Sequence, residues 1–518
     1  MKKGIISAGH EETAKAAAII LEEGGNAFDA ALGAMLAACV AEPVLASLGG
    51  GGFLLARPAE TDPQLYDFFV QTPGAKLPRD DTDFYPIIAD FGTAQQEFHI
   101  GLGAMACPGM VRGLFGVHAD LGTMPLARIA EPARKLAKDG LRINRQQAYI
   151  LSVVEKIFSS NANCLAAYGS TIKPSSVLRE GENFTNTDFS DFLDALTREG
   201  EDLFYRGEIA ARIDQDCRTG GGHLRRQDLE DYAMVRRAPL QVALGDRLLL
   251  SNPPPSCGGI LIAFALSALE DAALETCEFG SKGHLEILAK VMDLTNEARV
   301  AARLHERGDH DPRESLLDPK LLDIYKKRIA GHAAAHRGTT HINVADSKGN
   351  AASLSVSNGE GTAYIVPGTG IMINNMLGEE DVVPTGFHNW PPDTRMSSMM
   401  APSALVDPDG AVTVMGSGGS NRIRTAILQV LLNLTSFAMP LERAVSSPRI
   451  HQEGGVLSLE PGFREESVAA LCDLYPDHKM WSDRNMFFGG VHTVRYDPKG
   501  RTSDAAGDPR RGGVSIVL

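Results

Sequence analysis

The stretch "HRGTTHINVADSKGNAASLSVSNGEG", residues 336–361, carries the pattern of two strands joined by a turn. Ile342 and Val344 alternate with polar or small residues, which is the period of a β-strand. "DSKGN", residues 346–350, predicts a turn, and "AASLSVS", residues 351–357, predicts the returning strand. This part of the chain therefore predicts an antiparallel strand pair.

A Gly-Thr step stands directly before the first of these strands. If Thr339 were the first residue of a chain, its α-amine, with a pKa of about 7.7 to 8, would serve as the base for its own hydroxyl. The peptide bond between Gly338 and Thr339 can break autocatalytically. The Thr339 hydroxyl attacks the carbonyl of Gly338, the acyl group shifts from nitrogen to oxygen, and water cleaves the ester. Glycine permits the strained backbone that this step requires. Thr-Thr at the start of a strand also fits ordinary β propensity, so the Gly-Thr step alone does not distinguish a self-cleavage site from an ordinary strand.

Composition excludes several classes of function. The 518 residues are 43% hydrophobic, which is ample for a core, and the net charge is -15. The acidity disfavours nucleic acid and gives no reason to expect an anionic membrane surface as partner. The seven cysteines form no CxxC pair, so neither a disulfide framework nor a zinc site is expected. Attack by a threonine hydroxyl with its own α-amine as base needs no metal or organic cofactor.

The apolar segments indicate a chain without a membrane span. The start of the chain lacks the uninterrupted apolar stretch of a signal peptide, so we expect a cytoplasmic protein. The most apolar segment, residues 30–41, is too short to cross a bilayer and predicts a buried core helix.

Helical patterns occupy both ends of the chain, and strand pairs lie between them. Residues 13–23 and 123–143 have helical periodicity, and residues 416–434 predict a glycine loop that opens a long helix. Residues 402–416 predict a second strand pair around "DPDG". "SLGGGGFLLA", residues 47–56, lacks the Gly-Lys-Ser/Thr of a phosphate loop and predicts a buried strand. This order favours sheets sandwiched between helices.

Ten segments in order resemble the γ-glutamyltransferase (γ-glutamyltranspeptidase) family of N-terminal nucleophile (Ntn) hydrolases. "EEGGNAFDAA", "SLGGGGFLLA", "GTMPLARIAEPARKLAKDG", "GEDLFYRGEIAARI", "GGHLRRQDLEDYAMVRRAPL" and "NPPPSCGGI" are similar to its larger segment, and "GTTHINVADSKGNA", "GTGIMINNMLGEED", "RMSSMMAP" and "GSGGSNRIRTAI" to its smaller one. The resemblance implies an α+β fold, a four-layer αββα sandwich formed as one large domain from two autoprocessed segments, residues 1–338 and 339–518. It also implies cleavage after Gly338 and transfer or hydrolysis of a γ-glutamyl group.

The resemblance assigns the catalytic roles by matched position. Thr339 is the nucleophile, and Ser357, eighteen residues on, keeps the second hydroxyl that hydrogen-bonds to it, with serine for threonine. In "GSGGSNRI" the oxyanion-hole N–H donors fall on Gly419 and Ser420, where close backbone approach and a helix start favour a developing negative charge.

The resemblance also implies the substrate contacts. Ser397 and Ser398 match the pair that holds the α-carboxylate, although one extra residue before Pro402 leaves their register open by one position. Glu379 matches the acidic residue for the α-amino group, with Glu380 and Asp381 as alternatives. Asn358 is the nearest match to an asparagine that meets the same group.

The largest departure from the family lies in "YDFFVQTPG". Phe69 stands where the family has an arginine that clamps the α-carboxylate, so a bidentate ionic contact is absent. Arg395, two residues before Ser397, is a candidate replacement. Phe69 favours an acyl group that is less charged or lacks a free α-carboxylate, and glutathione as substrate stays an open question.

Three functions compete. The first is an autoprocessing γ-glutamyltransferase or γ-glutamyl hydrolase. The second is an Ntn amidase or acylase with another acyl donor, such as a β-lactam side chain or a polyglutamyl chain. The third is an uncleaved, inactive homologue kept as a binding protein. If the protein has either of the two enzyme functions, we expect a small-molecule amide substrate. We also expect a heterodimer of the two fragments, which could dimerise further.

Overall fold

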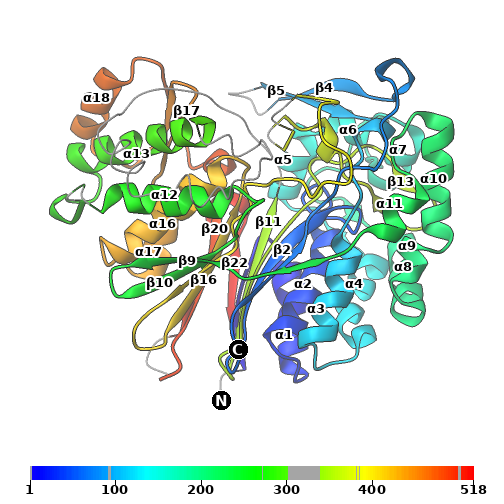
Figure 1. Ribbon diagram of the computed structural model, residues 1–518, viewed down its shortest axis with the longest axis horizontal. Coiled ribbons are helices and arrows are strands. Elements are labelled where there is room, and N and C mark those ends of the chain that lie inside the picture. Colours follow the sequence, from blue (N-terminus) through cyan, green and yellow to red (C-terminus); the bar gives the residue numbers. More distant parts are fainter. Residues whose placement is uncertain are drawn as a thin grey trace.

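Two β-sheets lie face to face in the middle of the molecule, and helices cover the outer face of each (Figure 1). The computed structural model describes residues 3–90, 95–270, 272, 274–301, 339–380, 382–383, 386–499 and 503–518. The four-layer αββα sandwich expected from the sequence is confirmed.

The first sheet has seven antiparallel strands with the predicted strand pair at its centre. Their spatial order is β22 (Val514–Val517), β1 (Gly4–Ala8), β11 (Thr340–Asp346), β12 (Ala351–Ser357), β2 (Gly51–Arg57), β3 (Gln64–Phe68) and β8 (Val235–Arg237). The residues of β11 and β12 are buried throughout, because helices cover one face of the sheet and the second sheet covers the other. The glycine-rich segment forms β2, as predicted, and pairs with β12.

The second sheet has six strands and also mixes both ends of the chain. Their order is β21 (Asp504–Ala506), β20 (Gly490–Tyr496), β16 (Val412–Gly418), β15 (Ser403–Val406), β10 (Arg247–Ser251) and β9 (Leu240–Leu244). The predicted pair around "DPDG" is the β15–β16 hairpin.

Two groups of helices form the outer layers. On the first sheet lie α1 (Glu11–Glu22), α2 (Ala27–Ala41), α3 (Met110–Leu121) and α4 (Leu126–Asp139), followed outward by α5 (Arg145–Val153), α6 (Glu155–Phe158), α7 (Ala162–Tyr168), α8 (Thr187–Glu199), α9 (Asp202–Tyr205), α10 (Glu208–Gly220) and α11 (Arg226–Asp231). On the second sheet lie α12 (Gly258–Leu269), α13 (Lys282–Ala301), α16 (Arg422–Thr435), α17 (Leu441–Ser446) and α18 (Glu465–Leu474).

Three short strand pairs and one three-stranded sheet complete the described strands. They are β4–β5 (Tyr85–Asp90 and Gln95–Ile100), β6–β7 (Leu141–Arg142 and Asn183–Phe184), β13–β14 (Ile365–Val366 and Ile371–Met372), and β17–β18–β19 (Ile450–Glu453, Val456–Leu459 and His478–Met480).

Helix α2 is the apolar segment that was predicted to be a buried core helix. All of its residues are buried, and it packs on β11 and β12. Asn26 begins the helix with a capping box that it shares with Asp29. In the described part of the chain, no helix is both long and apolar enough to span a membrane.

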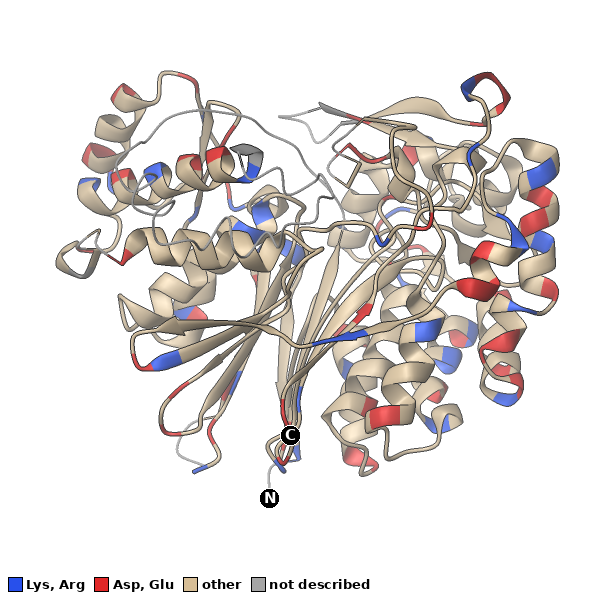
Figure 2. Cartoon of the chain, in the orientation of Figure 1, with Lys and Arg blue, Asp and Glu red and all other residues tan. Residues whose placement is uncertain are grey.

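Charged residues of both signs alternate on the outermost helices, whereas the central strands carry few (Figure 2). Many charges on α9 and α10 form pairs one turn apart, such as Asp202 with Arg206 and Asp214 with Arg218. Exposed pairs of this kind contribute at most about 1 kcal/mol each, so they serve solubility more than stability.

A polar layer lies between the two sheets. The inward-facing His341 shares a hydrogen bond with the Asn343 side chain at 3.0 Å, and burial lowers the pKa of His341 to about 3, so the ring is neutral. Asn343 donates to the carbonyl of His492 on β20 at 2.9 Å, and Ser353 donates to the carbonyl of Met415 on β16 at 3.0 Å. These bonds fix the position of one sheet relative to the other.

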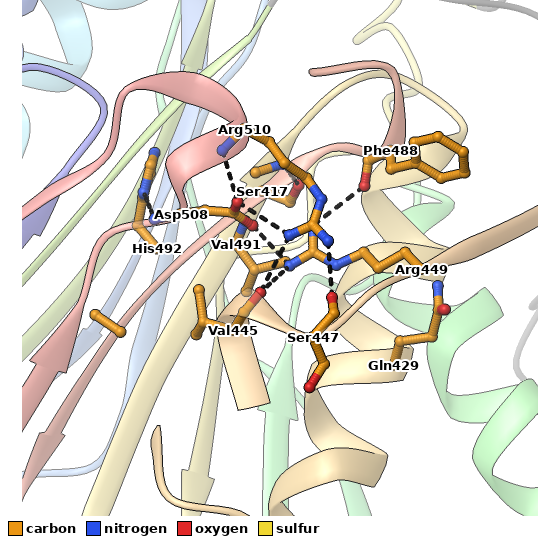
Figure 3. A network of polar contacts seen from close by, with 12 residues as sticks. Ser417, Gln429, Val445, Ser447, Arg449, Phe488, Val491, His492, Asp508 and Arg510 are labelled. Carbon is orange, nitrogen blue, oxygen red and sulfur yellow. Dashed lines mark hydrogen bonds and ion pairs between the residues drawn. The ribbon is translucent and has the colours of Figure 1, made fainter. Parts of the chain in front are cut away.

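A fully buried ionic network anchors the C-terminal segment (Figure 3). Asp508 lies 2.6 Å from the Arg449 guanidinium and 3.2 Å from that of Arg510, which also binds Glu460. Burial alone would raise the pKa of Asp508, but the two guanidinium groups lower it to about 2. Removing one partner of such a network leaves uncompensated buried charge, which costs about 3–5 kcal/mol.

We expect Asp508→Asn to lower the free energy of unfolding by about 3–5 kcal/mol, because the amide keeps the shape but not the charge. Urea unfolding monitored by circular dichroism measures this. Asp504→Asn, an exposed position on β21, is the matched control and should change little.

The difference between wild type and Asp508→Asn should depend on pH. The folded-state pKa of Asp508 is depressed, so its stabilisation is present at neutral pH and is lost as the pH falls towards about 2. A difference that stays constant down to that pH would contradict the assignment of the effect to the Asp508 charge.

Candidate active site

Thr339 lies directly before β11, beside the end of β12. In the β11–β12 ladder Thr340 is opposite Val356, and continuing this register by one residue places Thr339 opposite Ser357. Thr339 and Ser357 are 5% and 4% exposed, respectively. The Ser357 hydroxyl also accepts a hydrogen bond from the N–H of Gly359 at 3.1 Å. Gly338, the residue before the predicted cut, lies outside the described residues.

A pocket of about 340 Å³ gathers residues that are far apart in the chain. Its polar lining is Thr339, Ser357, Glu379, Ser398 and Ser420. Its apolar lining is Phe69, Met376, Val382, Met399, Met400 and Ile423. The structure therefore brings five of the sequence-predicted site residues to one cavity, together with Phe69. Gly419, Ser397, Asn358 and Arg395 are not among its described lining residues.

The glycine loop after β16 runs against Thr339. A Cβ on Gly418 would lie only 2.0 Å from the carbonyl oxygen of Thr339. Gly419 and Ser420 follow with φ of +120° and +52°, and their carbonyls accept the hydrogen bonds that start α16. The start of this helix, with its positive dipole end, thus lies beside Thr339, and this arrangement can stabilise a negative charge.

Arg511 binds the backbone of Thr339 and holds it in place. Its guanidinium donates a hydrogen bond to the Thr339 carbonyl at 3.1 Å. Burial lowers the pKa of Arg511 to about 10, which leaves it protonated at neutral pH. The adjacent Arg510 belongs to the network of Figure 3, so that network also fixes the place of Arg511.

Glu42 holds the next residue of β11. Its carboxylate accepts hydrogen bonds from the hydroxyls of Thr340 at 2.6 Å and Thr13 at 2.8 Å. Sequence reasoning missed both Glu42 and Arg511. Neither lies in a motif that points to Thr339, and each reaches it from a distant part of the chain.

Glu379 follows a short 3₁₀ turn, Met376–Gly378, and is 2% exposed. Its carboxylate packs so closely on Gly359 that a Cβ there would lie 2.1 Å from Oε1. Of the two alternatives, Glu380 is exposed to solvent and Asp381 lies outside the described residues. The buried Asn358 lies next to Ser357, with its side chain near Gly50 and Gly361.

The serine pair divides between two environments. Ser398 lines the pocket, and its hydroxyl accepts a hydrogen bond from the N–H of Met400 at 3.0 Å. Ser397 instead places its hydroxyl 3.1 Å from the sulfur of Cys257. The proline loop before α12 binds the Ser398 carbonyl through the N–H of Cys257 and the hydroxyl of Ser256.

Phe69 forms part of the pocket wall, and Arg395 lies behind it. The Phe69 ring stacks on Phe53 with centroids 5.4 Å apart. The Arg395 guanidinium donates to the carbonyl of Phe69 and to the Tyr232 hydroxyl, and it lies 3.7 Å from Asp67. Its charge is therefore directed at the backbone and at Asp67.

The remaining titratable groups form no metal site in the part of the chain that the structure describes. There, no three His, Cys, Asp or Glu side chains cluster as metal ligands. All seven cysteines are free thiols, five of them buried.

A hydroxyl residue at the start of a central strand, facing a glycine loop across an αββα sandwich, defines an Ntn hydrolase. The γ-glutamyltranspeptidase family model matches residues 13–518, and the chain belongs to this family. It is an enzyme of the γ-glutamyltransferase and hydrolase type.

Named relatives include both hydrolases and acylases. The chain is 28% identical to the acylase ACY 1 proenzyme of Pseudomonas sp. (strain V22), over 97% of this chain and 92% of the relative. It is 29% identical to the glutathione hydrolase proenzyme of Escherichia coli (strain K12), over 91% and 85%.

Solved structures share the fold. A cephalosporin acylase from Bacillus halodurans superimposes with a TM-score of 0.84 at 21% identity, covering 99% of this chain and 96% of that one. The γ-glutamyltranspeptidase of Helicobacter pylori gives a TM-score of 0.55 at 25% identity, covering 63% and 91%.

The contact between Gly418 and Thr339 yields a direct prediction. Gly418→Ala should lower kcat on an amide substrate by about a hundredfold, because the added methyl group must displace the Thr339 backbone. Gly283→Ala on α13 is the control, since its Cβ would meet only the Cys277 sulfur at 3.3 Å. Unchanged turnover in a folded Gly418→Ala protein would contradict the close approach.

Proposed function

We propose that the chain cuts itself after Gly338 and then transfers or hydrolyses an amide-linked acyl group through an ester on Thr339. The observation that carries this proposal is the single pocket lined by Thr339, Ser357 and Ser420. On this proposal the two products, residues 1–338 and 339–518, remain associated as a heterodimer.

In the proposed reaction the freed α-amine of Thr339 accepts the proton of its own hydroxyl as the oxygen attacks the amide carbonyl. The N–H groups of Gly419 and Ser420 stabilise the resulting oxyanion. The amine product leaves with the proton, and an acyl ester remains on Thr339. Water or a second amine then attacks this ester and restores the hydroxyl. Ser357 positions the nucleophile.

For a γ-glutamyl donor, Glu379 is the proposed contact of the α-amino group, with Asn358 as a second contact. Ser398 is the proposed contact of the α-carboxylate, supported by its place in the pocket lining. Ser397, held beside Cys257, would assist from the neighbouring position. We assign Arg395 to holding Phe69, because its guanidinium is bound to the Phe69 carbonyl and to Tyr232.

A second candidate function, an acylase for less polar acyl groups, is favoured by Phe69. This ring stands in the pocket wall beside Met376, Val382 and Ile423. Such a wall favours an apolar acyl chain over a charged one, because transfer of a carboxylate to an apolar surface is costly. The naming of one relative as an acylase supports the same proposal.

Thr339→Ala should give one uncut chain without amidase activity, since both the cut and the turnover use the same hydroxyl. Gel electrophoresis and an anilide hydrolysis assay measure the two effects. Thr339→Ser, which keeps a hydroxyl, is the matched control and should still be cut. An active Thr339→Ala protein would refute the assignment of the nucleophile.

Phe69→Arg should raise the ratio of activity on γ-glutamyl anilide to activity on an apolar acyl anilide by about tenfold or more, through a new charged hydrogen bond. Phe69→Met, which removes the ring without adding charge, is the control. If Phe69→Arg still processes itself but keeps the wild-type ratio, the substrate carboxylate is held elsewhere.

A further inference from the structure

A second pocket is lined by Arg511, the residue whose guanidinium binds the Thr339 carbonyl. It lies between the end of β1, the segment after α2, and helix α5, and its space of about 460 Å³ includes a part that is open to solvent. We call it the Glu42–Arg511 pocket after the two charged residues in its lining. Among the described residues, none lines both this pocket and the active-site pocket.

Arg511 contributes a buried positive charge that makes no close ion pair with the described residues, although the carboxylates of Asp508, Glu42 and Glu360 act on it at longer range. Its side chain is 6% exposed, and its one hydrogen bond to the described residues goes to the Thr339 carbonyl. Its Nε has no acceptor, and no carboxylate of the described residues lies within 4.0 Å of its guanidinium. A buried guanidinium with an unsatisfied donor is costly, and a carboxylate is the group that matches it best.

Glu42 contributes the opposite charge to the same lining. It is 6% exposed, and its hydrogen bonds come from two neutral hydroxyls, those of Thr13 and Thr340. No Lys or Arg nitrogen of the described residues lies within 4.0 Å of it. A carboxylate ligand alone would be repelled by Glu42, whereas a ligand that also carries an ammonium group would satisfy both charges.

The rest of the wall is mostly aliphatic. Val44, Leu45, Ile143, Ile150 and Leu151 line it. The other polar lining side chains are largely engaged with one another: His10 bonds to Asn144 at 3.0 Å, and Asn144 and Gln147 form the capping box of α5. The two charges and this wall together match a small zwitterion with a branched aliphatic side chain.

We propose that the Glu42–Arg511 pocket binds a free apolar α-amino acid of about the size of leucine. Its carboxylate pairs with Arg511, its ammonium group pairs with Glu42, and its side chain lies against the aliphatic wall. Both charged residues also hold the first residues of β11, at Thr339 and Thr340. The bound amino acid therefore contacts the two groups that position the nucleophile.

Isothermal titration calorimetry with L-leucine tests the proposal on the full chain. The background is the double variant Glu379→Gln/Ser398→Ala, which removes the proposed amino-acid contacts of the active site, so success or failure here is independent of the proposed function. We expect saturable binding at one site per chain. Isopentylamine and isocaproate, which each lack one charged group, should bind at least about tenfold more weakly.

Ile150→Glu tests the location of the site. Ile150 is half-buried on α5, and a carboxylate there would place a second negative charge in the pocket. We expect it to weaken leucine binding by at least about tenfold. Ser152→Glu, on the same helix but outside the pocket, should leave binding unchanged.

Three results would overturn the proposal. The first is no heat of binding with millimolar leucine. The second is equal affinity for leucine and isocaproate, which would show that Glu42 takes no part. The third is an Ile150→Glu protein that binds as well as the Ser152→Glu control, which would place the ligand elsewhere.

Discussion

The close approach of the end of β16 to the backbone of Thr339 is the constraint on which the rest of the site depends. Gly418 has no side chain, so the second sheet can touch the first at Thr339, directly before β11. The left-handed turn at Gly419 and Ser420 then directs the start of α16 at the same point. A larger residue at Gly418 would separate Thr339, the proposed nucleophile, from the proposed oxyanion donors.

The interleaving of the two segments explains how a cut after Gly338 would leave the molecule intact. In the first sheet, β11 and β12 lie between β1 and β2, which belong to the other segment. In the second sheet, β10 pairs with β15 across the same division. Ladder hydrogen bonds therefore cross between segments in both sheets, and the buried ionic network of Asp508 secures the last strands.

Local pattern was enough to predict the elements that position the site. The alternation in residues 340–345 and the turn at 346–350 predicted β11 and β12, and their register follows from the turn. The glycine loop and α16 were also predicted, from the sequence pattern of residues 416–434. Resemblance to the family then placed Thr339, Ser357, Glu379, Ser398 and Ser420, which line one pocket.

The groups that bind Thr339 and Thr340 at the start of β11 could not be predicted in this way. Arg511 meets Thr339 across 172 positions of the chain, and Glu42 meets Thr340 across 298. Neither spacing has a period or a motif, because such contacts depend on how the sheets and helices pack. The contacts of Arg395 could not be predicted for the same reason. Its position two residues before Ser397 did not reveal that the Arg395 guanidinium is bound to the Phe69 backbone.

The most direct test of the central claim is the intact mass of the purified protein under denaturing conditions. Self-cleavage before Thr339 predicts two species of about 36 and about 19 kDa, by proportion to length, with the smaller one beginning at Thr339. One species of 55.4 kDa, unchanged after prolonged incubation, would contradict the account, because Thr339 would then have no free amine to act as its base.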